Sequence, residues 1–410
     1  MTLFEPDRHE PLASTTAAWE VGAARAAIGR LVDDIVRARL PAGHWPVHPL
    51  DDDDGSDAQA TGYQSLYLGS AGVVWALWWL KCVAAADPQI DFSAAIRCAD
   101  DAYRQAPDTG EAVPSYFLND VGIGLLRWRI TGESDAADRV SAAVQANIPN
   151  PTNEALWAAP GTMIAAWHLW QATGEARWRT LFGANVDQLW RTWHEAPAVG
   201  GWLWTQDLYG RSVQYLGAGH GFVGNLLPLL KGAALLDDAR RETLVMRAQQ
   251  TLQATATHDG EAANWPPAIA PPRPGRPPFL MQWCHGAPGV VSALADLPVG
   301  VAPALDALLV AAGEAVWRAG PLAKGVGLCH GTAGNALALL TLHRRTGDAV
   351  WLTRARAFVM HAVAQSDAMR EQHGRGRYTL WTGDPGLAVA LWQCLDEGAP
   401  AGMPALDFIG

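Results

Sequence analysis

Apolar residues recur along the chain at the spacing of buried helix faces. A helix expected over about residues 16–39 carries its apolar stripe at Ile28, Leu31, Ile35 and Val36. Another stripe follows the same spacing near the C-terminus, at Trp351, Ala355, Phe358, Val359 and Ala362. Stretches with the alternating pattern of strands are sparse, so the pattern predicts an all-α protein.

A short turn motif divides the chain into seven units. Each unit has an aromatic or apolar approach, then Gly-x-x-Gly or a degenerate form of it, then an apolar helix. The anchor positions are Gly69/Gly72, Asn119/Gly122, Gly161/Ile164, Gly221/Gly224, Gly286/Gly289, Gly331/Gly334 and Gly383/Gly386. The intervals between them leave room for two helices each, which indicates an array of helical hairpins.

The array is expected to close into an α/α toroid (barrel) of seven helical-hairpin repeats, with an open superhelix as the alternative. The Gly-x-x-Gly turns would then lie at one end, and the helices that follow them would form the inner ring. No linker divides the chain, so we expect one domain over residues 1–410. Residues 1–60 would supply an N-terminal helix and an acidic loop that lead into the repeats.

Composition and charge narrow the function classes. Hydrophobic residues make up 49% of the chain and charged residues 17%, as in a well-buried globular protein. The net charge of −11 without a basic run argues against binding of nucleic acid or anionic membranes. The N-terminus lacks the features of a signal peptide, and no apolar run could span a membrane. The five cysteines have no disulfide-framework spacing, so a cytoplasmic location is expected.

Two loops have both a structural and a functional interpretation. Residues 51–54 are four consecutive aspartates, but they lack the Gly and Glu spacing of a known calcium loop, which favours a solvated acidic loop. Residues 266–278 contain seven prolines. This segment is either an irregular connector or a rim over the site that follows it.

The chemistry concentrates at three consecutive turns. The residue before each first anchor is, in order, Leu68, Leu118, Pro160, His220, His285, His330 and Thr382. Cys284 and Cys329 each come one position earlier in two of these turns. Adjacent repeats are neighbours in space, and thiolate and imidazole are preferred zinc ligands.

Cys284, Cys329 and His330 therefore form a predicted three-ligand zinc set. His220 or His285 would supply a fourth ligand, or water or substrate would occupy that position. Two thiolates nearly neutralise the cation, which favours holding a thiol substrate as thiolate over activating water.

These turns resemble the lanthionine synthetase C-like (LanC-like) family. The resemblance runs through the seven turns and is most specific at Trp283-Cys284-His285-Gly286-Ala287-Pro288-Gly289 and Gly327-Leu328-Cys329-His330-Gly331. Further support comes from Gly219-His220-Gly221-Phe222-Val223-Gly224 and Gly383-Asp384-Pro385-Gly386. The resemblance implies an α/α toroid with a central zinc ion. It also implies an enzyme that adds a thiol to dehydroalanine or dehydrobutyrine and so forms a thioether.

The resemblance also implies catalytic roles. His220 matches the family's acid/base histidine. Asp120 matches its acidic residue, although this chain has Asn119 where family members usually have glycine, and a capping or turn-forming aspartate is the alternative. His285 is the third catalytic candidate; it stands where many bacterial cyclases have tyrosine and the eukaryotic relatives have histidine.

Cationic residues near the metal turns are the substrate-binding candidates. Lys324 matches the glutathione-handling relatives and would bind a carboxylate or phosphate, unless it is simply an exposed lysine. Arg375 and Arg377, just before the seventh turn, are the next candidates.

We therefore expect zinc-dependent addition of a small thiol such as glutathione to a dehydrated peptide or protein, phosphorylated or not. One alternative is an intramolecular lanthionine-forming cyclase. Another is a zinc-containing glutathione- or peptide-binding scaffold without catalysis. A toroidal glycosidase or terpenoid cyclase is disfavoured, because it needs paired carboxylates or an Asp-rich motif on inner helices.

Overall fold

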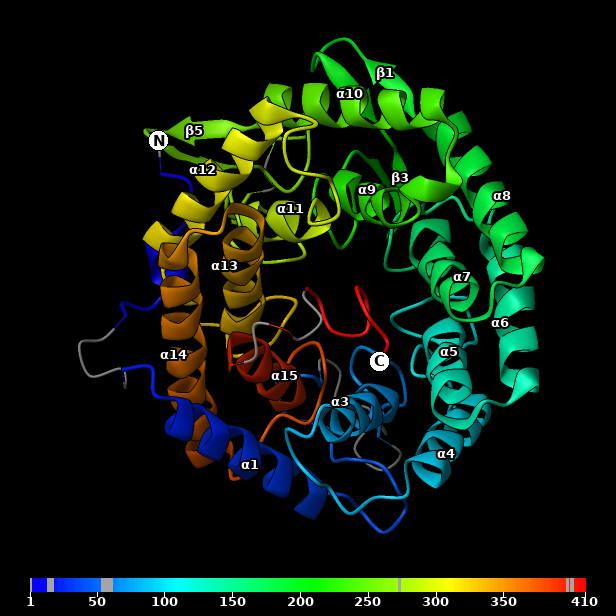
Figure 1. The fold of residues 1–410 in the computed structure, drawn as a ribbon, viewed down its shortest axis with the longest axis vertical. Helices are drawn as coiled ribbons and strands as arrows, with labels where there is room; N and C mark the ends of the chain where they lie inside the picture. The colour runs from blue at the N-terminus through cyan, green and yellow to red at the C-terminus, as the bar shows by residue number, and fades with distance from the viewer. Residues whose placement is uncertain (1, 13–17, 53–61, 272–273, 396–397, 399–401) are drawn as a thin grey trace.

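The described part of the chain is mostly helical and forms two concentric rings (Figure 1). The computed structural model describes residues 2–12, 18–52, 62–271, 274–395, 398 and 402–410. The inner ring consists of α3 (Ser70–Cys82), α5 (Asp120–Thr131), α7 (Ala159–Thr173), α9 (Phe222–Lys231), α11 (Ala287–Ala293), α13 (Thr332–Thr346) and α15 (Asp384–Leu395). The outer ring consists of α1 (Val21–Arg37), α4 (Phe92–Gln105), α6 (Ser134–Asn147), α8 (Ala176–Thr192), α10 (Asp238–Thr255), α12 (Pro303–Ala319) and α14 (Ala349–His373).

Helix α1 completes the outer ring. It packs against α15, so the first helix of the chain lies beside the last (Figure 1). Its buried residues include Ile28, Leu31 and Ile35, as the apolar stripe predicts, while Val36 is half-buried. The N-terminal helix is therefore part of the ring, as the outer neighbour of α15, rather than a segment that only leads into it.

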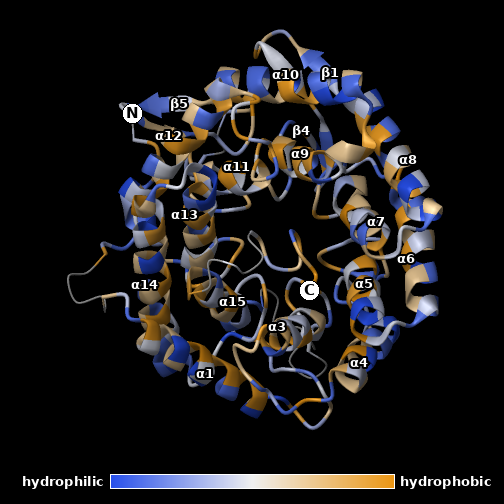
Figure 2. Ribbon diagram, in the orientation of Figure 1, coloured by the Kyte–Doolittle hydropathy of each residue, from blue (hydrophilic) through white to orange (hydrophobic). Residues whose placement is uncertain are grey.

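Burial explains the difference between the two rings. Inner helices such as α13 and α15 are buried on nearly every side, and a helix that is apolar all round needs such surroundings. Outer helices bury one face only; α4 buries Ala95, Ile96 and Ala99. Figure 2 shows hydrophilic stretches along the outer helices, alternating with hydrophobic ones. No helix within the described residues is long and apolar enough to cross a membrane.

The seven turns share a backbone that only glycine allows. A Cβ atom at Gly334 would lie 1.8 Å from the carbonyl oxygen of Leu328, six residues earlier. The same approach to the carbonyl six residues earlier recurs, at distances of 1.9–2.3 Å, at Gly72, Gly122, Gly161, Gly224, Gly289 and Gly386. These seven glycines therefore mark one repeated turn at the start of each inner helix.

This geometry corrects the register of the third turn. Ala158 caps α7, and a Cβ at Gly161 would meet the carbonyl of Ala155. The anchor pair is thus Ala158/Gly161, and the predicted pair Gly161/Ile164 was wrong by three residues. The residue before the first anchor is consequently Trp157, not Pro160.

Strands are few in the described part of the chain, as expected, and form three short antiparallel hairpins there. They are β1 (His194–Ala196) with β2 (Gly201–Leu203), β3 (Gln206–Leu208) with β4 (Arg211–Val213), and β5 (Thr257–Asp259) with β6 (Ala262–Asn264). The described residues also form two short 3-10 helices, η1 (Pro6–Arg8) and η2 (Ala233–Leu235).

The acidic loop is not simply solvated. Asp51 is buried and its carboxylate forms an ion pair with the guanidinium of Arg377, which is also buried. The prediction of a solvated loop was therefore wrong at Asp51, because a charge taken out of water needs such a partner. Asp53 and Asp54 lie outside the described residues.

Residues 402–410 fill the middle of the ring (Figure 1). Met403, Leu406 and Ile409 are buried there. His168 of α7 hydrogen-bonds the carbonyl of Leu406 over 3.0 Å, and Lys231 at the end of α9 pairs with Asp407 over 2.6 Å. These contacts come from the C-terminal halves of inner helices, so the segment lies at the end of the ring opposite the glycine turns.

Candidate metal centre

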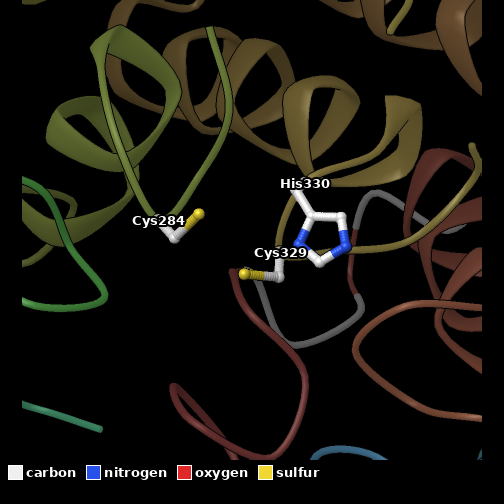
Figure 3. Close-up of side chains that lie close together, drawn as sticks. All are labelled: Cys284, Cys329 and His330. Atoms are coloured by element: carbon white, nitrogen blue, oxygen red, sulfur yellow. The ribbon is translucent and has the colours of Figure 1, made fainter. Parts of the chain in front are cut away.

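Two neighbouring turns bring three donor side chains together. Cys284, Cys329 and His330 each offer a ligand atom, and these atoms all lie within 4.8 Å of one another (Figure 3). The backbone N–H of Cys284 donates to the carbonyl of Cys329 over 3.2 Å and ties the two turns together. Two sulfurs and an imidazole nitrogen at this spacing can hold a metal ion, and the donor set is one that zinc prefers.

The two thiols of the cluster differ in how readily they ionise. The hydrogen bond from Cys329, helped by His330, lowers the pKa of Cys284 well below its usual value. Burial, together with the neighbouring sulfur, raises the pKa of Cys329. Gln282 donates to Cys284 Sγ over 2.9 Å, and the Tyr67 hydroxyl hydrogen-bonds Cys329. One thiolate therefore forms readily, and the second proton is the one that a metal cation would displace.

His220 forms a dyad with a buried carboxylate. Its Nδ1 lies 2.9 Å from Oε2 of Glu154, which is fully buried. Burial alone would lower the pKa of His220, but the hydrogen bond and charge of Glu154, with the charge of Cys284, raise it above its ordinary value. Because Nδ1–H donates to Glu154, Nε2 is the ring nitrogen free to exchange a proton.

Sequence reasoning missed Glu154. It stands four positions before the cap residue Ala158, as Gln282 stands four positions before Gly286. Its carboxylate also accepts the backbone N–H groups of Leu156 and Trp157, which fixes the turn. The correct register of the third turn would have aligned Glu154 with Gln282 and marked it as a candidate.

Asp120 lies in a different environment. It is the first residue of α5, and burial raises the pKa of its carboxyl. The charged groups that act on it are Arg139, Asp100 and Arg104, all on outer helices α4 and α6. The acidic partner of His220 in the structure is therefore Glu154.

His285 lies beside the dyad. The centroid of its ring is 5.9 Å from that of His220, and the ring of Tyr215 lies 6.1 Å from each. Burial lowers the pKa of His285. Its Nδ1 has no hydrogen-bond partner among the described residues. His285 thus has a ring nitrogen available to a ligand.

A cavity of about 450 Å³ opens in front of these histidines. His220, Gln282 and His285 line it, and so does Lys324, as the sequence suggested. The proline-rich segment contributes five prolines to its wall, so the interpretation of this segment as a rim is confirmed. Arg375 and Arg377 are not among the lining residues; Arg375 is half-buried, and Arg377 is engaged by Asp51.

Comparison with known proteins agrees with this site. The family model described as "Lanthionine synthetase C-like protein" matches residues 200–406, which include every residue of the metal cluster. Glutathione S-transferase LANCL1 of Danio rerio is 35% identical over 147 residues, which are 35% of this chain and 34% of that protein. LanC-like protein GCL1 of Arabidopsis thaliana is 34% identical over 185 residues, 44% of this chain and 40% of that protein.

Among solved structures, nisin cyclase has a similar fold. The TM-score is 0.58 at 14% sequence identity, and the match covers 83% of this chain and 95% of the cyclase. The alignments to the two curated relatives span about a third and two fifths of their lengths. The family model spans half of this chain and matches the turns that carry the metal cluster. The chain belongs to the lanthionine synthetase C-like family.

Proposed function

We propose that the protein is a zinc-dependent enzyme that adds a thiol to dehydroalanine or dehydrobutyrine in a peptide or protein. The observation that carries this proposal is the position of the Cys284–Cys329–His330 cluster beside the His220–Glu154 dyad. A metal site alone would suit a structural role. A proton-transfer pair close enough for the charge of Cys284 to act on His220 is what a chemical step requires.

Cys284, Cys329 and His330 would hold the zinc ion. When bound, zinc would favour the reactive thiolate form of a thiol substrate. The chain's own contribution is to orient the ligands. Gln282 hydrogen-bonds Cys284, Tyr67 hydrogen-bonds Cys329, and such outer contacts fix the direction in which a ligand points.

His220 would handle the proton at carbon. The sulfur forms a bond to the β-carbon of the dehydroamino acid, and the electron pair of the double bond moves to the α-carbon and its carbonyl. Protonated His220 then donates its Nε2 proton to the α-carbon, and the proton of the thiol returns to the histidine through solvent. Glu154 keeps the imidazole protonated and oriented, so it is a positioning residue for this step.

The thiol that we favour is glutathione. One similar protein is named a glutathione S-transferase. His285 and Lys324 line the cavity, and Lys324 could anchor a carboxylate of the tripeptide. An intramolecular cyclase would need no such anchor, because its thiol belongs to the peptide itself.

Mass spectrometry can test the function directly. The zinc-loaded protein is incubated with a dehydroalanine peptide and glutathione, and the thioether adduct is quantified against the uncatalysed rate. A second peptide carries both dehydroalanine and cysteine and reports ring formation. Accelerated glutathione addition supports the proposal, ring formation alone supports the cyclase, and tight binding without either product supports a scaffold.

The same proposal covers architecture and location. We treat residues 1–410 as one α/α-toroid domain of seven hairpins, in which α1 and α15 form the closing pair. A reducing cytoplasm would suit the free thiols of the cluster.

A further inference from the structure

The cavity that His220, Gln282 and His285 line is strongly cationic. Arg8, Arg211, Arg276 and Lys324 line it, while no aspartate or glutamate does so among the described residues. The chain as a whole carries a net charge of −11. Four positive charges around one cavity in an acidic protein create a local field that attracts anions.

Four separate segments supply these charges. Arg8 lies in η1, Arg211 in β4, Arg276 in the proline-rich segment and Lys324 in the loop before the sixth turn. None of them forms an ion pair with a residue that the structure describes. Arg377, by contrast, is paired with Asp51 and does not line the cavity. Unpaired cations that converge on one cavity repel one another until an anion binds, so the arrangement favours a ligand with several negative charges.

The N-terminal segment holds Arg8 firmly at the cavity. Asn264 donates to the carbonyl of Leu3 over 2.8 Å, and the backbone N–H of Ala323 donates to the carbonyl of Arg8 over 3.0 Å. The carboxylate of Glu10 contacts Nε2 of His361 at 2.6 Å. Residues 3–10 thus lie beside the loop that carries Lys324 and bring the side chain of Arg8 to the cavity. The sequence did not suggest this role for the N-terminal segment.

A small thiol accounts for only part of this charge. The glutathione of the proposed function has two carboxylates and one ammonium group besides its sulfur, so Lys324 alone would balance its net charge. The three arginines then remain for the second substrate. A cavity of about 450 Å³ is in the size range of small-ligand sites and admits an extended peptide segment rather than a folded surface.

We propose that the acceptor is an anionic peptide segment, with carboxylate or phosphate groups beside the dehydroamino acid, and that Arg8, Arg211 and Arg276 select it. This inference rests on the proposed function for the identity of the reaction, and it adds the chemical class of the acceptor. Guanidinium groups suit this role because they bind carboxylates and phosphates through paired hydrogen bonds. The rigid proline wall would keep the segment extended.

Matched acceptor peptides test the selection. Three dehydroalanine peptides of one length carry glutamate, glutamine or lysine at the flanking positions, and a fourth carries phosphoserine. With zinc-loaded protein and fixed glutathione, we expect kcat/KM for the glutamate and phosphoserine peptides to exceed that of the glutamine peptide at least tenfold. The lysine peptide should be the slowest. The ratio of the glutamate to the phosphoserine value tells which anion the cavity prefers.

Variants assign the effect to the arginines. Arg8→Gln, Arg211→Gln and Arg276→Gln should each reduce the preference for the glutamate peptide about tenfold, through its KM. Arg30→Gln removes the same charge from an exposed position on α1 and should leave the preference unchanged. Equal kcat/KM for the glutamate and glutamine peptides would overturn the inference, as would variants that change the KM of glutathione and not that of the peptide.

A binding measurement separates this inference from the proposed function. Peptides with serine in place of dehydroalanine cannot react, and their binding is measured by titration calorimetry. Arginine-dependent binding of the acidic serine peptide, without any thioether from the dehydroalanine peptides, would refute the reaction but support the acidic-ligand site. Thioether formation at equal rates from acidic and neutral peptides would support the reaction but refute the acidic-ligand site.

Discussion

The first and sixth turns have the same backbone and different chemistry. In the first turn, the N–H of Ser70 donates to Tyr63 and that of Ala71 to Gln64, over 2.9 and 3.1 Å. In the sixth turn, the N–H of Thr332 donates to Gly325 and that of Ala333 to Val326, over the same distances. Yet the two positions before the cap residue are Tyr67-Leu68 in one turn and Cys329-His330 in the other.

The comparison separates the backbone structure of a turn from the chemistry of its side chains. The close approach of a glycine to a carbonyl recurs at each inner helix, and in the first, fourth and sixth turns the same pair of backbone hydrogen bonds accompanies it. The proposed roles of the turns, in metal binding, proton transfer or packing, differ through the two side chains that precede the cap residue. The first turn is not idle either, because Tyr67 occupies the position equivalent to Cys329 and its hydroxyl reaches that thiol.

The largest expected effect on zinc binding and activity comes from removing a cysteine of the fifth or sixth turn. Cys284→Ala or Cys329→Ala should abolish zinc binding and, with it, thioether formation, because two ligands cannot hold the ion tightly. Elemental analysis of the purified variants checks this. Cys82→Ser, at an exposed cysteine outside the cluster, should keep one zinc per chain. Full zinc retention in either alanine variant would refute the ligand set.

The fourth turn should matter for rate and not for metal. His220→Ala should keep zinc and lower the thioether-forming rate by roughly 10²–10⁴, the usual contribution of a general acid/base. The ratio of zinc to protein and the rate are measured on the same preparation. Zinc lost together with His220 would instead identify it as a fourth ligand.

The pH dependence of the rate in Glu154→Gln tests the role of His220 further. Glu154 helps to raise the pKa of His220, so the proton-donating form persists to a higher pH than an ordinary histidine allows. Without that carboxylate the pKa falls, and the decline of the rate on the alkaline side should begin at lower pH. An unshifted profile would show that His220 is not the group that titrates.

A single added methyl group should disrupt the shared backbone structure of a turn. A Cβ at Gly334 would lie 1.8 Å from a backbone carbonyl, so Gly334→Ala should lower the free energy of unfolding by about 3 kcal/mol or more. Gly183 lies inside α8 with open space around its missing Cβ. Gly183→Ala should raise stability by about 0.5–1 kcal/mol. Denaturant titration compares the two variants, and equal effects would contradict the steric argument.

Lys324 offers a smaller effect beside the same turn. Lys324→Ala should weaken the apparent affinity for glutathione about ten- to a hundredfold and leave zinc in place, because one charge-assisted contact is lost. Ring closure of a peptide by its own cysteine should change less. A protein that closes rings readily yet ignores millimolar glutathione would reverse the assignment of the thiol.

The smallest effect tests the first turn. Tyr67→Phe removes one hydrogen bond to Cys329 and should lower zinc affinity about tenfold, as other outer contacts of metal ligands do. Competition with a chelator of known affinity measures it. Tyr378→Phe removes a hydroxyl that bonds Asp34, away from the cluster, and should change nothing.

The sequence predicted the features that repeat and missed those that depend on register or long-range pairing. Seven glycine turns, apolar inner helices and two Cys-His-Gly motifs were visible as patterns. The third turn was misaligned because Ala158 replaces the first glycine, and this hid Glu154. The pairing of Asp51 with Arg377 joins positions 326 residues apart, and no local pattern encodes it.

The residues that line the cationic cavity were likewise predicted only in part from the sequence. Lys324 was predicted because it stands near a motif. Arg8 and Arg211 were not, since each lies far from the metal turns in sequence and reaches the cavity only through the closed ring. Closure brings α15 against both α1 and α3, so the two ends of the chain are in contact.

Residues 402–410 have a consequence for the order of events. They fill the ring at the end away from the glycine turns, so in the proposed reaction thiol and acceptor would both enter from the end of the turns. A thiol bound at the cluster would then lie deeper than a peptide at the proline rim. An acceptor that arrives first would then block the thiol, so the proposed reaction would bind thiol before peptide. Excess acceptor would inhibit such a reaction, and its rate would depend on the concentration of the small thiol.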